Sequence, residues 1–338
     1  MSPGRTTQVV LTSDDVRLHV EVDEPEDPAV ASGLTLVLAH GYTLDSRSWT
    51  FQRRTLSEAG HRVVLWDQRG HGRSASGDPA QHTISRLGED LGDLLAAVVP
   101  SGPVALVGHS MGAMAIMSYA GRRGEQLGER LHAVALVSTS AGGLDAVRWG
   151  LGQRVGSLVN EVGPIAAAQL AQHPRMFRAV RRHPTAILRA VLAASAFGSR
   201  VPASVRRLTS DMILGTDPAV MASFAPTLRT HDTYAALTSL SGVPVLVLVG
   251  DRDLLTPLAH SARIAQALPH AEHVVVQGGG HILMLEHPEC VSERLAMLAD
   301  RCLSSAPAAG WGEHAPRHTV IDLRPGRGHA ALSLGVLS

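Results

Sequence analysis

The sequence predicts an α/β fold built on a mostly parallel, doubly wound sheet. Short runs rich in Val and Leu recur along the chain, and continuous apolar runs are typical of strands that are buried on both faces. Stretches with helical spacing separate most of these runs. Residues 84–99 are an example, because their apolar side chains recur three or four positions apart. Strands and helices that alternate in this way indicate a parallel sheet covered by helices.

The predicted strands follow one another from the N-terminus. They are Gln8–Leu11, Leu18–Val22, Leu34–Ala39, Val63–Trp66, Val104–Val107, Val134–Val137, Val243–Val249 and His273–Val276. The first two lie close together in the chain, so we expect an antiparallel hairpin at one edge of the sheet.

Residues 142–240 break this alternation. They contain no Val-rich run, and prolines cut them into short segments rich in Ala, Leu and Arg. We therefore predict a helical cap inserted into a core that consists of residues 1–141 and 241–303. Pro, Gly and Ala dominate residues 304–338, so we expect a poorly ordered tail with one strand-like piece at Thr319–Leu323.

The composition excludes several classes of protein. Of the 338 residues, 45% are hydrophobic and 18% are charged, which excludes a disordered chain. Thirty basic residues balance thirty acidic ones, so no net positive charge indicates a nucleic-acid partner. All of the basic residues are Arg, and without Lys there is no Schiff-base chemistry.

Targeting and redox signals are also absent from the sequence. The first residues lack the apolar segment of a signal peptide, and no run of 18 apolar residues occurs. Cys290 and Cys302 fall on one predicted helix, about 18 Å apart, which is too far for a disulfide. We expect a cytoplasmic protein with free thiols, and the sequence leaves its oligomeric state open.

The sharpest chemical signal is Gly108-His109-Ser110-Met111-Gly112. It follows a predicted strand and precedes a helical stretch, which is the context of a strand–turn–helix nucleophile elbow. Glycines two residues either side of the serine let neighbouring elements approach the tight turn. A serine hydroxyl needs a base to become a useful nucleophile.

Two later segments offer a base and an acid. One predicted strand ends in Gly250-Asp251-Arg252-Asp253, and the next leads through three glycines to His281. Both segments follow the carboxyl end of a strand, where open α/β sheets place their sites. The position of the acid alone leaves Asp251 and Asp253 open.

With these motifs the chain resembles the α/β-hydrolase superfamily, in particular its esterase and lipase-like members with a helical cap. The resemblance covers about residues 8–303. The matching positions are His40-Gly41, the segment from Asp67 to Ser74 (DQRGHGRS), Gly108–Gly112, Gly250–Asp253 and Gly280-His281.

The resemblance implies roles for individual residues. Ser110 would be the nucleophile, His281 the base, and Asp253 the acid, because the family pattern is Gly-x-x-Asp. The backbone amides of Tyr42 and Met111 would form the oxyanion hole. Tyr42, Met176 and Phe177 are candidates for the substrate pocket, and the Asp67–Arg69 pair is expected to hold a tight turn near the site.

The predicted function is hydrolysis of an ester or related acyl compound through an acyl-enzyme, on a small, apolar substrate. The same residues would also serve a thioesterase, a C–C hydrolase, an acyltransferase or a cofactor-free haloperoxidase-like perhydrolase, because fold alone does not separate these reactions. Epoxide hydrolases and haloalkane dehalogenases need a carboxylate at the elbow, so Ser110 argues against them. A non-catalytic ligand receptor is a further alternative.

No metal or organic cofactor is implied by this reading. The predicted cap carries 11 Arg against 5 Asp and Glu, which would suit an anionic substrate or a carrier protein.

Overall fold

The computed structural model describes residues 4–25, 31–127, 130–144, 195–304, 317–323 and 331–333. Their strands form one sheet of 10 strands in the order β1-β2-β4-β3-β5-β6-β7-β8-β9-β10. The strands are β1 (Arg5–Leu11), β2 (Arg17–Asp23), β3 (Thr35–Ala39), β4 (Arg62–Trp66), β5 (Val104–His109), β6 (Leu131–Val137), β7 (Val245–Gly250), β8 (Glu272–Gln277), β9 (Arg317–Asp322) and β10 (Ala331–Ser333).

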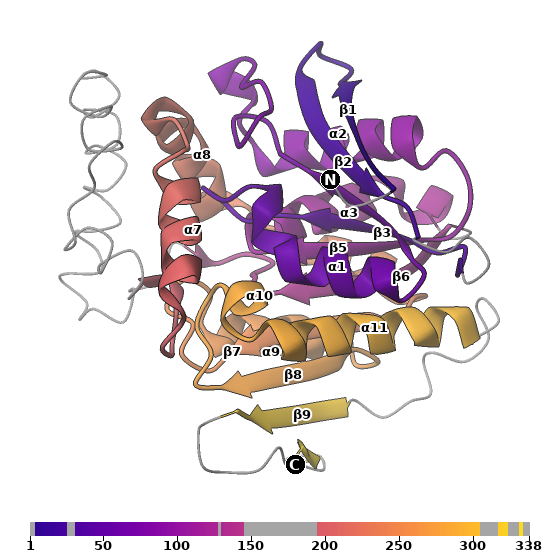
Figure 1. Cartoon of the computed structure of the whole chain (residues 1–338), viewed down its shortest axis with the longest axis vertical. Helices are drawn as coiled ribbons and strands as arrows, with labels where there is room; N and C mark the ends of the chain where they lie inside the picture. Colours follow the sequence, from indigo (N-terminus) through magenta and orange to yellow (C-terminus); the bar gives the residue numbers. More distant parts are fainter. Residues whose placement is uncertain are drawn as a thin grey trace.

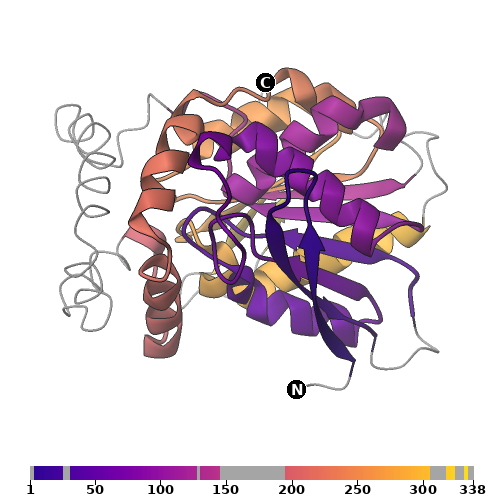
Figure 2. The same cartoon turned by 90° about the horizontal axis from the view of Figure 1, so that it is seen from above.

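Most of this sheet is parallel, which confirms the predicted fold class. Strands β4, β3, β5, β6, β7, β8 and β9 pair in parallel along the sheet. The predicted antiparallel hairpin is confirmed as well, because β1 pairs with β2 at one edge. Figure 2 shows this hairpin in indigo at the front of the molecule.

Helices cover both faces of the sheet (Figure 1). The apolar residues of β3 show why, because Val37 and Ala39 pack into one hydrophobic cluster and Leu36 and Leu38 into the other. The first cluster includes residues of α2 (Ile84–Val98), α3 (Met111–Leu127), α9 (Leu258–Ala267) and the 3₁₀ helix η5 (Ala235–Leu240). The second includes residues of α1 (Thr50–Glu58), α10 (Leu283–Glu286) and α11 (Pro288–Ser304). Side chains that alternate between two covered faces make the sheet doubly wound.

The helix predicted over residues 84–99 is confirmed as α2. It begins after Thr83, whose side chain accepts a hydrogen bond from the backbone N–H of Arg86 and so caps the first turn. Cys290 and Cys302 both lie on α11 as predicted, and both are free and buried. Two short 3₁₀ helices, η2 (Ser46–Trp49) and η3 (Pro79–Gln81), complete the first half of the chain.

The predicted C-terminal tail contains an ordered segment, residues 317–322. These residues form β9, which pairs in parallel with β8 from Glu272↔Arg317 to Gln277↔Asp322 and extends the sheet. The strand-like piece predicted at Thr319–Leu323 therefore exists, but it belongs to the core sheet. Backbone hydrogen bonds along β8 supply the stability that the sparse apolar composition of this segment did not indicate.

Only part of the predicted cap lies within the described residues. Between residues 195 and 240 the chain forms α7 (Ala203–Ile213), α8 (Pro218–Thr230) and η5. Figures 1 and 2 both show α7 and α8 together at one end of the sheet. The Thr216 hydroxyl donates to the carbonyl of Thr43, 3.3 Å away, in the loop that follows β3. Helices α7 and α8 therefore lie over the carboxyl ends of the parallel strands. Among the described helices, none is both long and apolar enough to cross a membrane.

Candidate active site

Ser110 occupies the turn between β5 and α3. Its backbone φ angle is 50°, in the left-handed region that a serine rarely adopts. The glycines on either side permit this turn because a side chain would find no room. A Cβ atom on Gly108 would lie 2.5 Å from the backbone of Ala113, and one on Gly112 would lie 2.5 Å from the carbonyl oxygen of Ala39. The sequence thus builds a strained, closely packed turn that holds Ser110 at the start of a helix.

The loops after β7 and β8 bring a carboxylate and an imidazole together. The Nδ1 atom of His281 lies 2.9 Å and 3.1 Å from the two carboxylate oxygens of Asp253. Asp251 makes a different contact, because its carboxylate accepts a hydrogen bond from the N–H of Gly278 at 2.6 Å. Of the two aspartates that the sequence left open, Asp253 is the one that contacts His281.

Asp253 is buried and firmly held. Its Oδ1 atom accepts the backbone N–H groups of Leu255 and Thr256, each at 2.9 Å, and its Oδ2 atom accepts the Thr256 hydroxyl at 2.8 Å. Burial alone would raise the pKa of Asp253, but His281 and the hydrogen bonds from Thr256 outweigh burial and lower the pKa. The carboxyl group is therefore ionised and oriented toward His281.

Thr256 has a role that the sequence analysis did not assign. Its hydroxyl also lies 3.4 Å from Nδ1 of His281, so one side chain touches both members of the pair. A hydroxyl residue three positions after the acid, just before Pro257, is typical of a turn in which a side chain binds the backbone, and this pattern could have indicated that Thr256 contacts Asp253.

The loop that carries His281 is fixed from three sides. The carbonyl of Ala196 accepts the N–H groups of His281 and Ile282, each at 3.0 Å. The Glu286 carboxylate accepts the N–H of Gly280 at 2.7 Å. A Cβ atom on Gly280 would clash with the backbone of Phe197, so only a glycine lets the two segments touch.

His109 supplies the third support for this loop. Its Nε2 atom lies 2.9 Å from the carbonyl oxygen of His281, and because a carbonyl only accepts, Nε2 carries the proton. Burial lowers the pKa of His109 well below its usual value, so the ring is neutral. The rings of His109 and His281 are 4.8 Å apart between centroids. The residue directly before Ser110 thus contacts the loop of the candidate base, a role that the motif alone does not reveal.

The candidate oxyanion-hole residues belong to two segments next to Ser110. Met111 is the first residue of α3, and the first N–H groups of a helix have no partner within the helix. Tyr42 follows Gly41, where a Cβ atom would lie 3.2 Å from Cβ of Ser110, so this loop passes directly beside the serine. The Tyr42 hydroxyl donates to the carbonyl of Met221 at 2.6 Å, which ties the loop to α8. Burial raises the pKa of Tyr42, so this hydroxyl remains protonated.

The turn after β4 is held by contacts other than the expected Asp67–Arg69 pair. The Arg69 guanidinium donates to Asp90 at 2.6 Å and to Asp14 at 2.9 Å, so that expectation is wrong. Asp67 instead accepts the N–H groups of Ser46 and Arg73, at 2.8 Å and 2.9 Å. These contacts connect the turn to the loop that follows β3.

Two further features concern the predicted pocket and metal binding. Met176 and Phe177, the other candidates for the pocket, lie outside the described residues. Among the residues that the structure does describe, no group of three or more His, Cys, Asp or Glu is placed to hold a metal ion.

The chain is similar to known proteins along most of its length. The sequence model of one family, described as the alpha/beta hydrolase fold, matches residues 35–288. An uncharacterized protein of Mycobacterium tuberculosis is 26% identical over 310 residues, covering 89% of this chain and 84% of its own. A Synechocystis protein named as a non-heme chloroperoxidase is 26% identical, covering 79% of this chain and 91% of its own.

Among solved structures, a thermophilic esterase from Thermogutta terrifontis has a similar fold. The TM-score is 0.66 at 24% sequence identity, and the match covers 88% of this chain and all of the esterase.

Proposed function

The chain belongs to the alpha/beta hydrolase fold family, and from this premise we propose that it is a serine hydrolase that cleaves an ester or a related acyl compound. The observation that carries the proposal is the contact between the Asp253 carboxylate and Nδ1 of His281, at 2.9 Å, next to the turn that holds Ser110. This contact leaves Nε2 of His281 as the nitrogen that accepts a proton from Ser110.

The proposed reaction has two halves. In the first, the Ser110 oxygen attacks the acyl carbonyl while His281 takes the hydroxyl proton, and His281 then gives that proton to the departing alcohol. In the second, His281 takes a proton from water, the hydroxide attacks the acyl-enzyme, and the acid leaves as Ser110 regains its proton. The ionised Asp253 keeps His281 in the required tautomer and stabilises the imidazolium that forms in each half.

The backbone amides of Tyr42 and Met111 would hold the negative charge on the carbonyl oxygen in both tetrahedral intermediates. The position of Met111 at the start of α3 adds the positive end of a helix dipole to this charge. The close approach of Gly41 to Ser110 brings the Tyr42 loop within reach of the same oxygen.

The proposal also assigns residues 142–240 as a cap over this site, with Tyr42, Met176 and Phe177 in the pocket. Its support is the pair of contacts that join the loop after β3 to the described part of the insert, from Tyr42 to α8 and from Thr216 to Thr43. A cap in this position would exclude bulk water and select the acyl group. Arginines in the insert would suit an anionic substrate or a carrier protein.

A second reaction on the same residues is favoured by the Synechocystis relative, which is named as a chloroperoxidase. Hydrogen peroxide would replace water in the second half, attack the acyl-enzyme and leave as a peroxy acid, while Ser110 regains its proton. Such a perhydrolase needs no cofactor, because neither half transfers electrons to the protein.

The test is a panel of p-nitrophenyl esters and acyl-thioesters of rising chain length, each with the wild type and with Ser110→Ala. We expect ester turnover in the wild type, and a loss of several orders of magnitude in the variant, because the three residues act as a unit. Ester hydrolysis that persists in Ser110→Ala would overturn the proposal. Peroxy-acid formation from the same esters, when hydrogen peroxide is added, separates the perhydrolase from the simple hydrolase.

A further inference from the structure

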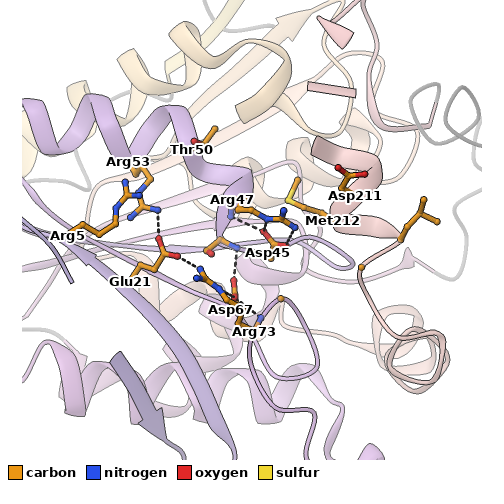
Figure 3. A pocket seen from close by; sticks show the side chains of 14 residues that line it. Arg5, Glu21, Asp45, Arg47, Thr50, Arg53, Asp67, Arg73, Asp211 and Met212 are labelled. Atoms are coloured by element: carbon orange, nitrogen blue, oxygen red, sulfur yellow. Dashed lines mark hydrogen bonds and ion pairs between the residues drawn. The ribbon is translucent and has the colours of Figure 1, made fainter. Parts of the chain in front are cut away.

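A second feature lies beside the loop that follows β3, and none of its lining residues belongs to the candidate active site. It is a cavity of about 730 Å³ between the β1–β2 edge of the sheet, the start of α1, the turn after β4 and the C-terminal end of α7 (Figure 3). This volume is within the range of small-molecule sites. The cavity lies beside Asp45 and Ser46, whereas the candidate oxyanion residue Tyr42 precedes them on the same loop.

Charged side chains line this cavity in equal numbers of each sign, but they are not equally accessible. The carboxylates of Asp67, Asp45 and Glu21 are 1%, 8% and 10% exposed. The guanidinium-bearing side chains of Arg47 and Arg73 are 52% and 55% exposed. Apart from Asp211, the acidic side chains of the lining are therefore covered, and Arg47 and Arg73 offer the most exposed charge, although the formal charges of the lining cancel.

The buried carboxylates hold the arginines in place. Nε and Nη2 of Arg47 donate to the two oxygens of Asp45, at 2.9 Å and 2.7 Å, as a two-point contact. Arg73 donates through Nη2 to Glu21, which also accepts from Arg53 at 2.5 Å (Figure 3). A guanidinium carries five N–H groups, so these contacts leave several donors on each arginine for a ligand.

Planar forks of N–H donors match the oxygens of carboxylates and phosphates, and a fork that is already oriented loses little entropy on binding. Asp211 is the exception in the lining, since its side chain is 45% exposed on α7, where its carboxylate lies 3.7 Å from the Arg207 guanidinium. Its negative charge would repel an anion at the α7 wall and favour one held at the opposite wall.

We propose that this cavity binds a small molecule through an oxyanion group, a carboxylate or a phosphate, which is held by the exposed guanidinium groups of Arg47 and Arg73. The ligand occupies a site other than the Ser110 turn, so binding and hydrolysis are separate properties of the chain.

The experiment measures binding calorimetrically with two probes, inorganic phosphate and succinate, at an ionic strength of about 20 mM, where charge interactions are weakly screened. The proteins are the wild type, the double variant Arg47→Gln/Arg73→Gln, Asp211→Asn, and the control Arg122→Gln. Arg122 suits this control because it lies on α3, outside the cavity, and is exposed to a similar degree, 45%.

The wild type is expected to bind at least one probe, and the double variant to bind it at least about tenfold more weakly, the loss that follows one missing charge-assisted hydrogen bond. Asp211→Asn should bind about threefold more tightly because a repulsive charge is removed. Arg122→Gln should bind like the wild type. Phosphate binding alone would indicate a ligand with a phosphate group, and succinate binding alone a ligand with a carboxylate.

Three results would overturn the proposal. They are no binding of either probe by the folded wild type, equal binding by the double variant, and an equal loss in Arg122→Gln. Circular dichroism checks that each variant folds. If the double variant does not fold, Arg47→Gln is compared with Asp211→Asn, and the first must weaken binding of the probe whereas the second must strengthen it. The binding assay does not depend on turnover, so its result does not test the proposed hydrolase function.

Discussion

Replacing Asp253 by Asn changes one hydrogen bond at the centre of the proposed mechanism. In the wild type, Oδ1 of Asp253 accepts two backbone N–H groups and Oδ2 accepts the hydroxyl of Thr256. Nδ1 of His281 lies within hydrogen-bond distance of both oxygens. An asparagine that keeps its carbonyl oxygen on the two backbone N–H groups must place its NH₂ group where Oδ2 was. An NH₂ group donates, so Nδ1 of His281 can no longer donate to it.

The imidazole would then carry its proton on Nε2, the nitrogen that must accept the proton of Ser110. A histidine in the wrong tautomer costs a serine hydrolase about 10⁴-fold in turnover, as in the serine protease triad, which corresponds to about 5.5 kcal/mol in the activation barrier. We expect a loss of this size in kcat/KM for Asp253→Asn, measured on a p-nitrophenyl ester at pH 8.

Asp251→Asn is the matched control, because it makes the same chemical change two residues away. Asp251 accepts only the N–H of Gly278 among these groups, and an amide oxygen can accept the same bond. Its kcat/KM should fall less than about tenfold, the scale of one ordinary hydrogen bond. A greater loss in Asp251→Asn than in Asp253→Asn, or a loss below tenfold in Asp253→Asn, would refute the reasoning.

Three further predictions concern buried groups around the site. Burial lowers the pKa of His71 from about 6.5 to about 3, so the unfolded chain binds a proton first as the pH falls. The stability that neutral His71 contributes is complete above about pH 6.5 and is lost as the pH falls toward 3, so that about 2 kcal/mol is lost at pH 5. Urea unfolding measures the free energy of unfolding at pH 8 and at pH 5, and the decrease between them should be smaller in His71→Gln than in the wild type. An identical decrease in both proteins would contradict this. Arg69→Met removes the partner that lies 2.6 Å from the buried Asp90 and leaves only Arg86, at 3.1 Å. It should lower the free energy of unfolding in urea by about 3 kcal/mol, with part of that recovered in Arg69→Met/Asp90→Leu. A change under 1 kcal/mol would contradict the role of the Arg69–Asp90 ion pair. His109→Leu removes the N–H group that donates to the His281 carbonyl, and it should lower kcat about tenfold with little change in KM. His109→Gln keeps a donor and should retain most of kcat. Equal losses of kcat in both variants would argue against a role for this hydrogen bond.

The strands could be predicted from the sequence because burial on both faces leaves a continuous apolar run. Val104–Val107 and Val134–Val137 are examples that fall inside β5 and β6. The strands near the two ends of the sheet were harder, since they carry more polar residues. Strand β1 begins at Arg5, three residues before the predicted run, and β9 contains Arg317 and His318 in a segment whose composition indicated a tail.

In the candidate site, too, some features could be predicted from the sequence and others depend on contacts between distant parts of the chain. The turn at Ser110 was visible from the spacing of its glycines, although only Gly108 is constrained by a close neighbour in the chain, Ala113, whereas Gly112 is constrained by Ala39. The residues alone left the partner of His281 open between Asp251 and Asp253. The family pattern Gly-x-x-Asp selected Asp253, and its carboxylate is the one that contacts the ring. The partner of Arg69 is Asp90, 21 residues away on α2, a contact that no local pattern contains.

The central claim is that Ser110 is a nucleophile activated by His281, and a fluorophosphonate label tests it most directly because the label reacts only with an activated serine. Wild type, Ser110→Ala and His281→Ala, each checked for folding, are treated with the label, digested and mapped by mass spectrometry. We predict one phosphonylated residue in the wild type, Ser110, with no label in Ser110→Ala and labelling slowed by orders of magnitude in His281→Ala. A wild type that stays unlabelled, or a label that persists in Ser110→Ala, would contradict the claim.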